Sequence, residues 1–240
     1  ENFPFCTIEP NVGIVSIVDE RLNKLAKLSA SEKCLHATIE FTDIAGLVKG
    51  ASKGEGLGNK FLSHIRATSA IVHVLRCFES DNIIHVDGKV NPLEDLDIIL
   101  SELIIADLEQ LERAKINIQK KAKSDKKEQE KLELLKSITS HLEKGIPLNQ
   151  VSLSDEEKTT LLSYQLLSLK PSLIVANVSE EQLESGSDWL KKIADKTGQE
   201  PLVICAELEH QLASLSPVEK EAYLEELNIK KNGFRPTCLC

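Results

Sequence analysis

The chain contains the stretch Ala37-Thr-Ile-Glu-Phe-Thr-Asp43, which runs directly into Ile44-Ala-Gly-Leu-Val-Lys-Gly-Ala-Ser-Lys-Gly-Glu-Gly-Leu-Gly-Asn59. Apolar and polar residues alternate over 37–42, which predicts a β-strand that ends at Asp43. Five of the chain's 11 glycines follow within 43–59. A glycine amide can approach a phosphate closely because no side chain blocks it, and an acidic residue at a strand end can reach a magnesium ion. The pattern therefore indicates a phosphate-facing loop.

The composition is that of a globular chain with one main core. Its 240 residues are 41% hydrophobic and 28% charged, and the net charge is -9. No run approaches the roughly 18 apolar residues of a membrane span, and no secretory signal opens the sequence. The negative charge argues against nucleic-acid binding through bulk charge, so we expect no DNA specificity, although a local basic patch stays open. The six cysteines form no CxxC pair, which favours reduced thiols and a cytoplasmic protein.

Strand and helix patterns alternate along the chain, which predicts an α/β fold with a mostly parallel sheet. The run 70–75 is nearly all apolar, so we expect that strand to be covered on both faces. Capping patterns at Ser154, Ser179 and Ser216 each predict a helix start, the first helix extending to about residue 168. Asp87-Gly88 predicts a hairpin turn. Further strands are expected at 12–18, 172–178 and 202–205, and further helices at 20–28, 59–68 and 187–197.

The amino-acid composition changes between Leu93 and Leu142, where glycine is absent and Lys, Glu and Leu dominate. Apolar positions recur there at alternating spacings of four and three, which predicts an antiparallel helical hairpin with coiled-coil packing. Its first helix, 96–122, would be about 40 Å long at ~1.5 Å per residue and would project as an arm. The alternative is a pair of ordinary bundle helices. The spacing is carried by Ile104, Leu108, Leu111, Lys115, Ile118 and Ala122, and by Leu132, Leu135, Thr139 and Leu142.

Four short segments lie where a nucleotide site of such a sheet would need them, at or near strand ends. Each also has a plain structural explanation: Asp43 as a turn former, Asn177 as a cap, Thr7 as a loop residue, and Cys205 and Ala206 as small core residues. Their order and spacing together favour the nucleotide site. The segments are Thr7 with its neighbours, Asp43-Ile-Ala-Gly46, Asn177-Val-Ser-Glu180, and Cys205-Ala-Glu-Leu-Glu209.

Several longer stretches resemble the Obg-like ATPase (YchF-type) family of P-loop proteins over residues 1–227. They are Asn2-Phe-Pro-Phe-Cys-Thr-Ile-Glu-Pro-Asn11, residues 43–62, Arg76-Cys-Phe-Glu-Ser-Asp-Asn-Ile-Ile-His85 and Lys89-Val-Asn-Pro92. The resemblance implies an OBG-type G domain interrupted by a helical coiled-coil arm. We therefore expect a first G-domain part at 1–92, the arm at 93–168, a second G-domain part at 169–229 and an atypical tail at 230–240.

The resemblance also implies roles for four residues near the phosphates. Thr7 would bind magnesium directly, Asp43 would hold it through water, and the Gly46 amide would meet the γ-phosphate. Leu47 stands where related GTPases often have a glutamine that orients the attacking water, and leucine cannot do that. The implied cofactor is Mg²⁺.

Base preference is argued at the ends of the last two strands, where the resemblance implies nucleotide contacts by Asn177, Val178, Glu180, Cys205 and Ala206. GTPases commonly use Asn-Lys-x-Asp to recognise guanine, and here valine replaces the lysine and glutamate the aspartate. The guanine pattern is thus broken, so we expect ATP to be preferred and GTP to be the weaker substrate.

Two departures from the family stand out. No G-x-x-x-x-G-K-[ST] phosphate loop occurs in the sequence, and the family's C-terminal TGS domain is not matched. Together with the absence of methionine, this predicts a fragment of a longer protein. We expect the full-length protein to be an ATPase switch that binds the ribosome or a ribosomal subunit, with RNA as a further candidate partner and no membrane. The alternatives are a non-catalytic interaction module that presents the arm, and an unstable truncation that exposes apolar surface at 37–42 and 70–75.

Overall fold

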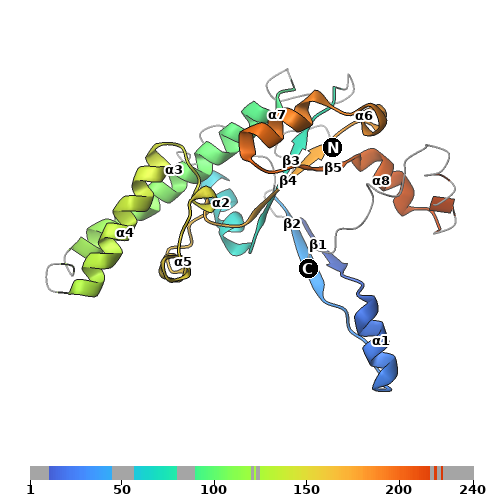
Figure 1. Ribbon diagram of the computed structural model, residues 1–240, viewed down its shortest axis with the longest axis horizontal. Helices are drawn as coiled ribbons and strands as arrows, with labels where there is room; N and C mark the ends of the chain where they lie inside the picture. Colours follow the sequence, from blue (N-terminus) through green and yellow to red (C-terminus); the bar gives the residue numbers. More distant parts are fainter. Residues whose placement is uncertain are drawn as a thin grey trace.

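The computed structural model describes residues 11–44, 57–79, 90–119, 122, 125–216, 219–220 and 223. The predicted turn at Asp87-Gly88 and the tail at 230–240 lie outside these residues. Within them, two sheets and a set of helices form a central body with two projections, one made of two long helices and one made of a β-ribbon and a helix (Figure 1).

The central sheet confirms the predicted α/β fold. Its three strands are parallel and follow the order β3-β4-β5. The pairing register places Arg76 opposite Asn177, and Asn177 opposite Ile204, so the three strands end level with one another. The strands are β3 (Ile71–Arg76), β4 (Ser172–Asn177) and β5 (Leu202–Ile204).

The other two strands, β1 (Asn11–Ser16) and β2 (Thr38–Asp43), pair antiparallel in a separate two-stranded sheet. Helix α1 (Glu20–Leu28) connects them, and the unit projects from the body (Figure 1). The sequence predicted all three elements but not this pairing, because alternation of residue types identifies a strand without naming its neighbour.

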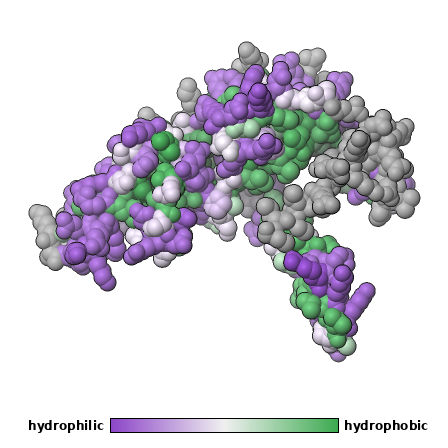
Figure 2. All heavy atoms as spheres, in the orientation of Figure 1, coloured by the Kyte–Doolittle hydropathy of each residue, from purple (hydrophilic) through white to green (hydrophobic). Residues whose placement is uncertain are grey.

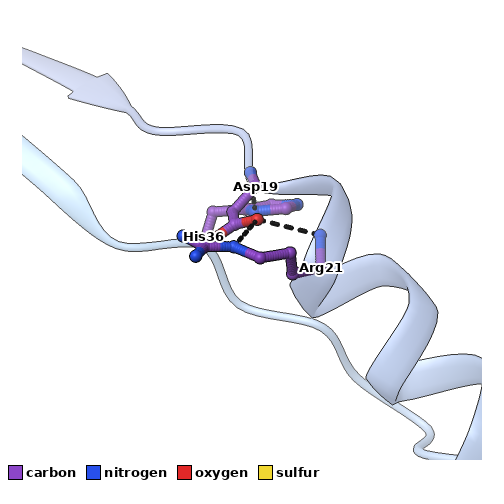
Figure 3. Close-up of polar contacts among 3 residues, drawn as sticks. All are labelled: Asp19, Arg21 and His36. Carbon is purple, nitrogen blue, oxygen red and sulfur yellow. Dashed lines mark hydrogen bonds and ion pairs between the residues drawn. The ribbon is translucent and has the colours of Figure 1, made fainter. Parts of the chain in front are cut away.

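Polar contacts at the root of α1 explain why the helix begins where it does. The Asp19 carboxylate accepts hydrogen bonds from the Arg21 backbone N–H (2.8 Å) and from the Arg21 guanidinium (2.8 Å at the closest), as Figure 3 shows. These bonds lower the pKa of Asp19. The Asp19 N–H donates to His36 Nδ1 (3.3 Å), which ties the start of α1 to the segment that enters β2.

The predicted helical hairpin is present as α3 (Pro92–Gln119) and α4 (Lys126–Glu143). The two helices lie side by side (Figure 1), and α3 is about 42 Å long at ~1.5 Å per residue. Apolar side chains spaced as the sequence predicted fill the space between them, including Leu111, Ile118, Leu132, Leu135 and Leu142. The same cluster includes Leu148, Leu161 and Leu166, so the segment that follows α4 also packs on the hairpin.

Three capping predictions are confirmed. Ser154 with Glu157 and Ser179 with Gln182 form capping boxes, and Ser216 and Glu219 exchange the same two hydrogen bonds. Gly198 ends α7 with φ +69°, the left-handed conformation that glycine adopts without strain. The helix that Ser154 caps ends at Leu162, earlier than predicted. The sequence did not predict α8 (Ala206–Ala213) or η1 (Leu148–Gln150). The elements are α2 (Leu57–Ala67), η1 (Leu148–Gln150), α5 (Asp155–Leu162), α6 (Glu180–Ser185), α7 (Asp188–Thr197) and α8 (Ala206–Ala213).

The main core lies on one face of the central sheet, where α3 and α7 pack against β3 and β4 through residues such as Leu75, Leu96, Ile174 and Ile193. The prediction that 70–75 is covered on both faces is wrong for this structure: Val74, pointing the other way, is 62% exposed. The reason is that neither Val72 nor Val74 belongs to an apolar cluster among the described residues, so nothing described there packs over that face of β3. None of the helices among the described residues has both the length and the apolar composition to span a bilayer.

Candidate nucleotide site

The carboxyl ends of the three parallel strands form one edge, and two backbone hydrogen bonds extend the ladder beyond it. Cys77 N donates to Asn177 O (2.8 Å), and Val178 N donates to Ile204 O (2.9 Å). The segments that leave β3, β4 and β5 therefore start side by side. In open α/β sheets this edge is where ligands bind.

Asn177 connects two of the predicted motifs directly. Its Oδ1 accepts a hydrogen bond from Ala206 N at 3.0 Å, across 29 residues of sequence. Ala206 is the first residue of α8, where a backbone N–H has no partner within the helix. The Asn177 Nδ2 group keeps two donors that no hydrogen bond engages among the described residues. The geometry thus leaves this amide available to an acceptor on a ligand.

The five residues predicted at this edge divide into an exposed group and a buried group. Glu180, the first residue of α6, and Ala206 are exposed, and Asn177 is partly exposed. Val178 and Cys205 are each 2% exposed and pack in apolar clusters. The side chains of Val178 and Cys205 thus hold the strand ends in place, and only their backbone atoms remain for ligand contact.

Asp43 occupies the end of β2, as predicted, and its side chain is exposed. It lies in the two-stranded sheet, which shares no strand pairing with the central sheet in the described part of the chain. The remaining predicted phosphate-side residues, Thr7, Gly46 and Leu47, lie outside the described residues. The structure therefore brings the base-side residues together, and Asp43 has no strand pairing with their sheet in the described part of the chain.

A magnesium ion usually takes one or two protein carboxylates and completes its shell with water and phosphate oxygens. The exposed carboxylate of Asp43 fits that donor chemistry. The described residues contain no group of three or more His, Cys, Asp and Glu side chains that would hold a metal on its own. A magnesium ion at Asp43 would accordingly take most of its ligands from water and nucleotide phosphates.

Two residues at the end of β3 were quoted for the resemblance but not predicted as site residues. Arg76 lies opposite Asn177, donates from Nε to Phe78 O (3.1 Å) and stacks on the Phe78 ring at 5.1 Å. Cys77 is 1% exposed, and burial raises the pKa of its thiol to about 11. Cys77 is therefore a neutral core residue near physiological pH.

A second set of contacts, which we call the α2–α3 joint, was not predicted. Lys170 donates from Nζ to Arg66 O (3.2 Å) and to Thr68 O, at the end of α2. Asp107, in the middle of α3, accepts from the backbone N–H groups of Leu167 and Ser168, each at 2.7 Å.

Asp107 is completely buried, whereas Lys170 is partly exposed. Burial raises the pKa of Asp107 and lowers that of Lys170. The sequence signal was weak, consisting only of a carboxylate inside an otherwise apolar helix face.

Comparison with known proteins gives consistent matches. A family model described as a 50S ribosome-binding GTPase matches residues 1–110. The chain is 48% identical over 236 residues to the ribosome-binding ATPase YchF of Escherichia coli O157:H7, and 46% identical over 239 residues to that of Bacillus subtilis strain 168. The solved structure of the Schizosaccharomyces pombe YchF GTPase superposes with a TM-score of 0.77 at 33% identity and covers 95% of this chain.

The chain belongs to the YchF family. It spans 65% of the length of both bacterial YchF proteins and 64% of the S. pombe chain. The S. pombe superposition shows that the α/β architecture described above is a YchF architecture. The relatives' names differ on the nucleotide, ATPase for the bacterial proteins and GTPase for the yeast one, so the name alone does not assign the base.

Proposed function

We propose that the full-length protein is a Mg²⁺-dependent ATP hydrolase that works as a nucleotide-controlled switch on the ribosome or a ribosomal subunit. The observation that carries the proposal is the hydrogen bond from Ala206 N to Asn177 Oδ1, which joins two predicted nucleotide-binding segments at the carboxyl edge of the parallel sheet. Membership of the YchF family supports the ribosomal partner, and a cytoplasmic location follows from it. RNA is a further candidate partner.

The base is proposed to be adenine. The Asn177 Nδ2 donors, which no hydrogen bond engages in the described part of the chain, suit an acceptor on the ring. The Oδ1 bond to Ala206 N holds this amide in place. Guanine recognition would need a carboxylate that meets two guanine donors at once, and the longer side chain of Glu180 moves its carboxylate away from that geometry. GTP is therefore proposed as the weaker substrate.

The phosphate side is proposed to consist of Thr7 and Asp43 around the magnesium ion and of the Gly46 amide at the γ-phosphate. Leu47 places a hydrocarbon where related enzymes orient water, so the attacking water must be positioned by another group. The two parts of the G domain, 1–92 and 169–229, would then carry the site, and the region 93–168 would present the arm to the partner.

ATP turnover by the full-length protein tests the role of Asp43. Asp43→Ala should lower turnover by roughly a hundredfold, the size of losing one electrostatic contact to the transition state. Asp155→Ala removes an exposed carboxylate far along the sequence, on α5, and should leave turnover unchanged. Undiminished turnover in Asp43→Ala would remove the residue from the proposed site.

A second candidate function is a non-catalytic module that presents the helical arm. It is favoured by the projecting α3–α4 hairpin and by the lack of a G-x-x-x-x-G-K-[ST] motif in this sequence. Isothermal titration of the present chain with ATP and Mg²⁺ separates the two functions. Micromolar binding would contradict the non-catalytic function. If the full-length protein hydrolyses ATP and this chain does not bind it, the non-catalytic function applies to this chain alone.

A further inference from the structure

The α2–α3 joint lies where the chain returns from the helical arm to the central sheet. Residues 167–170 of that returning segment contact α3 through the carboxylate of Asp107 and α2 through the ammonium of Lys170. The Lys170 contacts cross more than 100 residues of sequence. The joint is thus a tertiary contact of three segments that are distant along the chain.

The geometry makes the joint stiff. Both oxygens of Asp107 are used, each by one backbone N–H, and hydrogen bonds to an ionised acceptor are shorter and stronger than neutral ones. Lys170 places its positive charge at the carbonyl end of α2, where the helix dipole favours a cation. The Lys170 contacts therefore couple a shift of α2 to residues 167–170, and the Asp107 contacts couple those residues to α3.

Apolar packing surrounds these polar contacts. Leu62 and Ile65 of α2, Leu103 and Ala106 of α3, and Leu167 of the returning segment form one buried cluster. Close-packed side chains of this kind resist continuous deformation, so a displacement at one side is passed to the other side. The same three segments are therefore connected twice, by charge and by packing.

The joint lies between α2 and the arm. Helix α2 begins at Leu57, within the last residues of the glycine-rich stretch 43–59 that is proposed to face the phosphates, and the distal half of α3 forms the arm with α4. We infer that the α2–α3 joint transmits nucleotide-dependent displacement of α2 to the arm, with Lys170 and Asp107 as the coupling residues. This inference rests on the proposed function, because it requires a nucleotide that acts on the segment before α2.

Hydrogen exchange of the full-length protein, with and without ATP and Mg²⁺, tests the coupling. In the wild type, nucleotide should slow exchange both in 57–67 and in the arm helix 126–143. In Lys170→Met the response of 57–67 should persist, and the response of the arm should fall about tenfold, within the range of measured allosteric couplings. Lys170→Arg keeps a cationic donor and should retain the arm response.

The matched control is Lys158→Met, which removes an ammonium from an exposed pair with Asp155. It should leave the exchange of both helices and their responses unchanged. Asp107→Asn is a second coupling variant, because it keeps the side-chain shape but turns one acceptor into a donor that faces a backbone N–H. Asp107→Asn should also reduce the arm response. If Lys170→Met fails to fold, Lys170→Gln takes its place, because it removes the ammonium and keeps a neutral donor.

The outcomes separate the inference from the proposed function. If the wild type binds ATP and Lys170→Met keeps the full arm response, the joint is not the coupling element while the ATPase proposal stands. Suppose that a variant exchanges faster in the arm by the same factor with and without ATP, so that the effect of ATP on the arm is unchanged. That result would show a purely structural role for the joint and would also overturn the inference. If the wild type does not bind ATP in a separate titration, the proposed function itself fails, and the coupling fails with it.

Discussion

His73 is an ionisable side chain buried in the core face of β3. It is 5% exposed and borders a cavity of about 20 Å³, large enough for one water molecule, together with polar side chains that include Asn149, Ser172 and Thr197. Burial disfavours the charged imidazolium and lowers the pKa of His73. A single residue of the sheet therefore links the stability of the fold to pH.

We expect this link to appear as acid destabilisation. The unfolded chain takes up a proton at His73 below about pH 6.5, whereas the folded chain, with its lowered pKa, stays neutral over the window just beneath that value. The free energy of unfolding should fall there by up to ~1.4 kcal/mol per pH unit from this residue. Urea titrations of the wild type and His73→Gln between pH 7.5 and 5.5 measure the difference.

The control is His141→Gln, which alters a partly exposed histidine on α4. It should keep the wild-type pH dependence, because it leaves His73 and its buried surroundings intact. Equal slopes for the wild type and His73→Gln would show that His73 is hydrated in the folded chain.

The α3–α4 hairpin packs through an apolar seam, to which Leu148, Leu161 and Leu166 also contribute. Leu135 and Leu142 of α4 are 0% and 1% exposed, and they pack against α3 residues such as Leu111 and Ile118. The first half of α3, by contrast, contributes Leu96 to the core of the central sheet. One helix thus belongs both to the arm and to the body, which gives the hairpin a fixed base.

Leu135→Ala should lower the free energy of unfolding by about 2–5 kcal/mol, because it removes buried methyl groups and leaves a cavity. Leu162→Ala, at a side chain that is 70% exposed, is the size-matched control and should change stability by less than ~0.5 kcal/mol. Urea denaturation followed by circular dichroism measures both. Similar losses in the two variants would mean that the seam does not hold the hairpin together.

At the scale of the molecule, exposed apolar side chains gather in two places. One is the projecting unit β1–α1–β2 (Figure 2), where Ile14 and Phe41 are 69% and 51% exposed. The other is the face of β3 that carries Val74. Apolar patches of this kind promote association, particularly beside unpaired strand edges. The hypothesis of an apolar surface at 37–42 and 70–75 agrees with these exposures.

This chain should therefore bind the dye ANS in its folded state and associate as its concentration rises. The double variant Ile14→Thr and Val74→Thr keeps β-branched residues in the strands and should lower both effects by about half or more, since it removes apolar surface at both places. Sedimentation velocity and ANS fluorescence are the measurements. The control is Ile116→Thr, an exposed apolar residue on the arm. If the control and the double variant lower ANS binding and association equally, the two patches are not the cause of either effect.

The local sequence predicted most elements because each signal is confined to a few neighbouring residues. Ser154 with Glu157 marks a helix start, Gly198 marks an end, and the regular leucine spacing marks the hairpin. Helix α8 was missed because its N-cap Cys205 and its first residue Ala206 were assigned to a strand end and a ligand contact. The error shows the limit of motif spacing, which places residues at an edge without giving their backbone conformation.

The sequence by itself determined the α/β class, the helical hairpin and the family resemblance, since periodicity, caps and short motifs are properties of adjacent residues. Only the tertiary structure decided that β1 and β2 pair with each other, that Val178 points into the core, and that Asn177 reaches Ala206. It also decided the joint of Asp107 and Lys170. Contacts across 29 to 104 residues depend on how elements pack in space, and no local pattern records that packing.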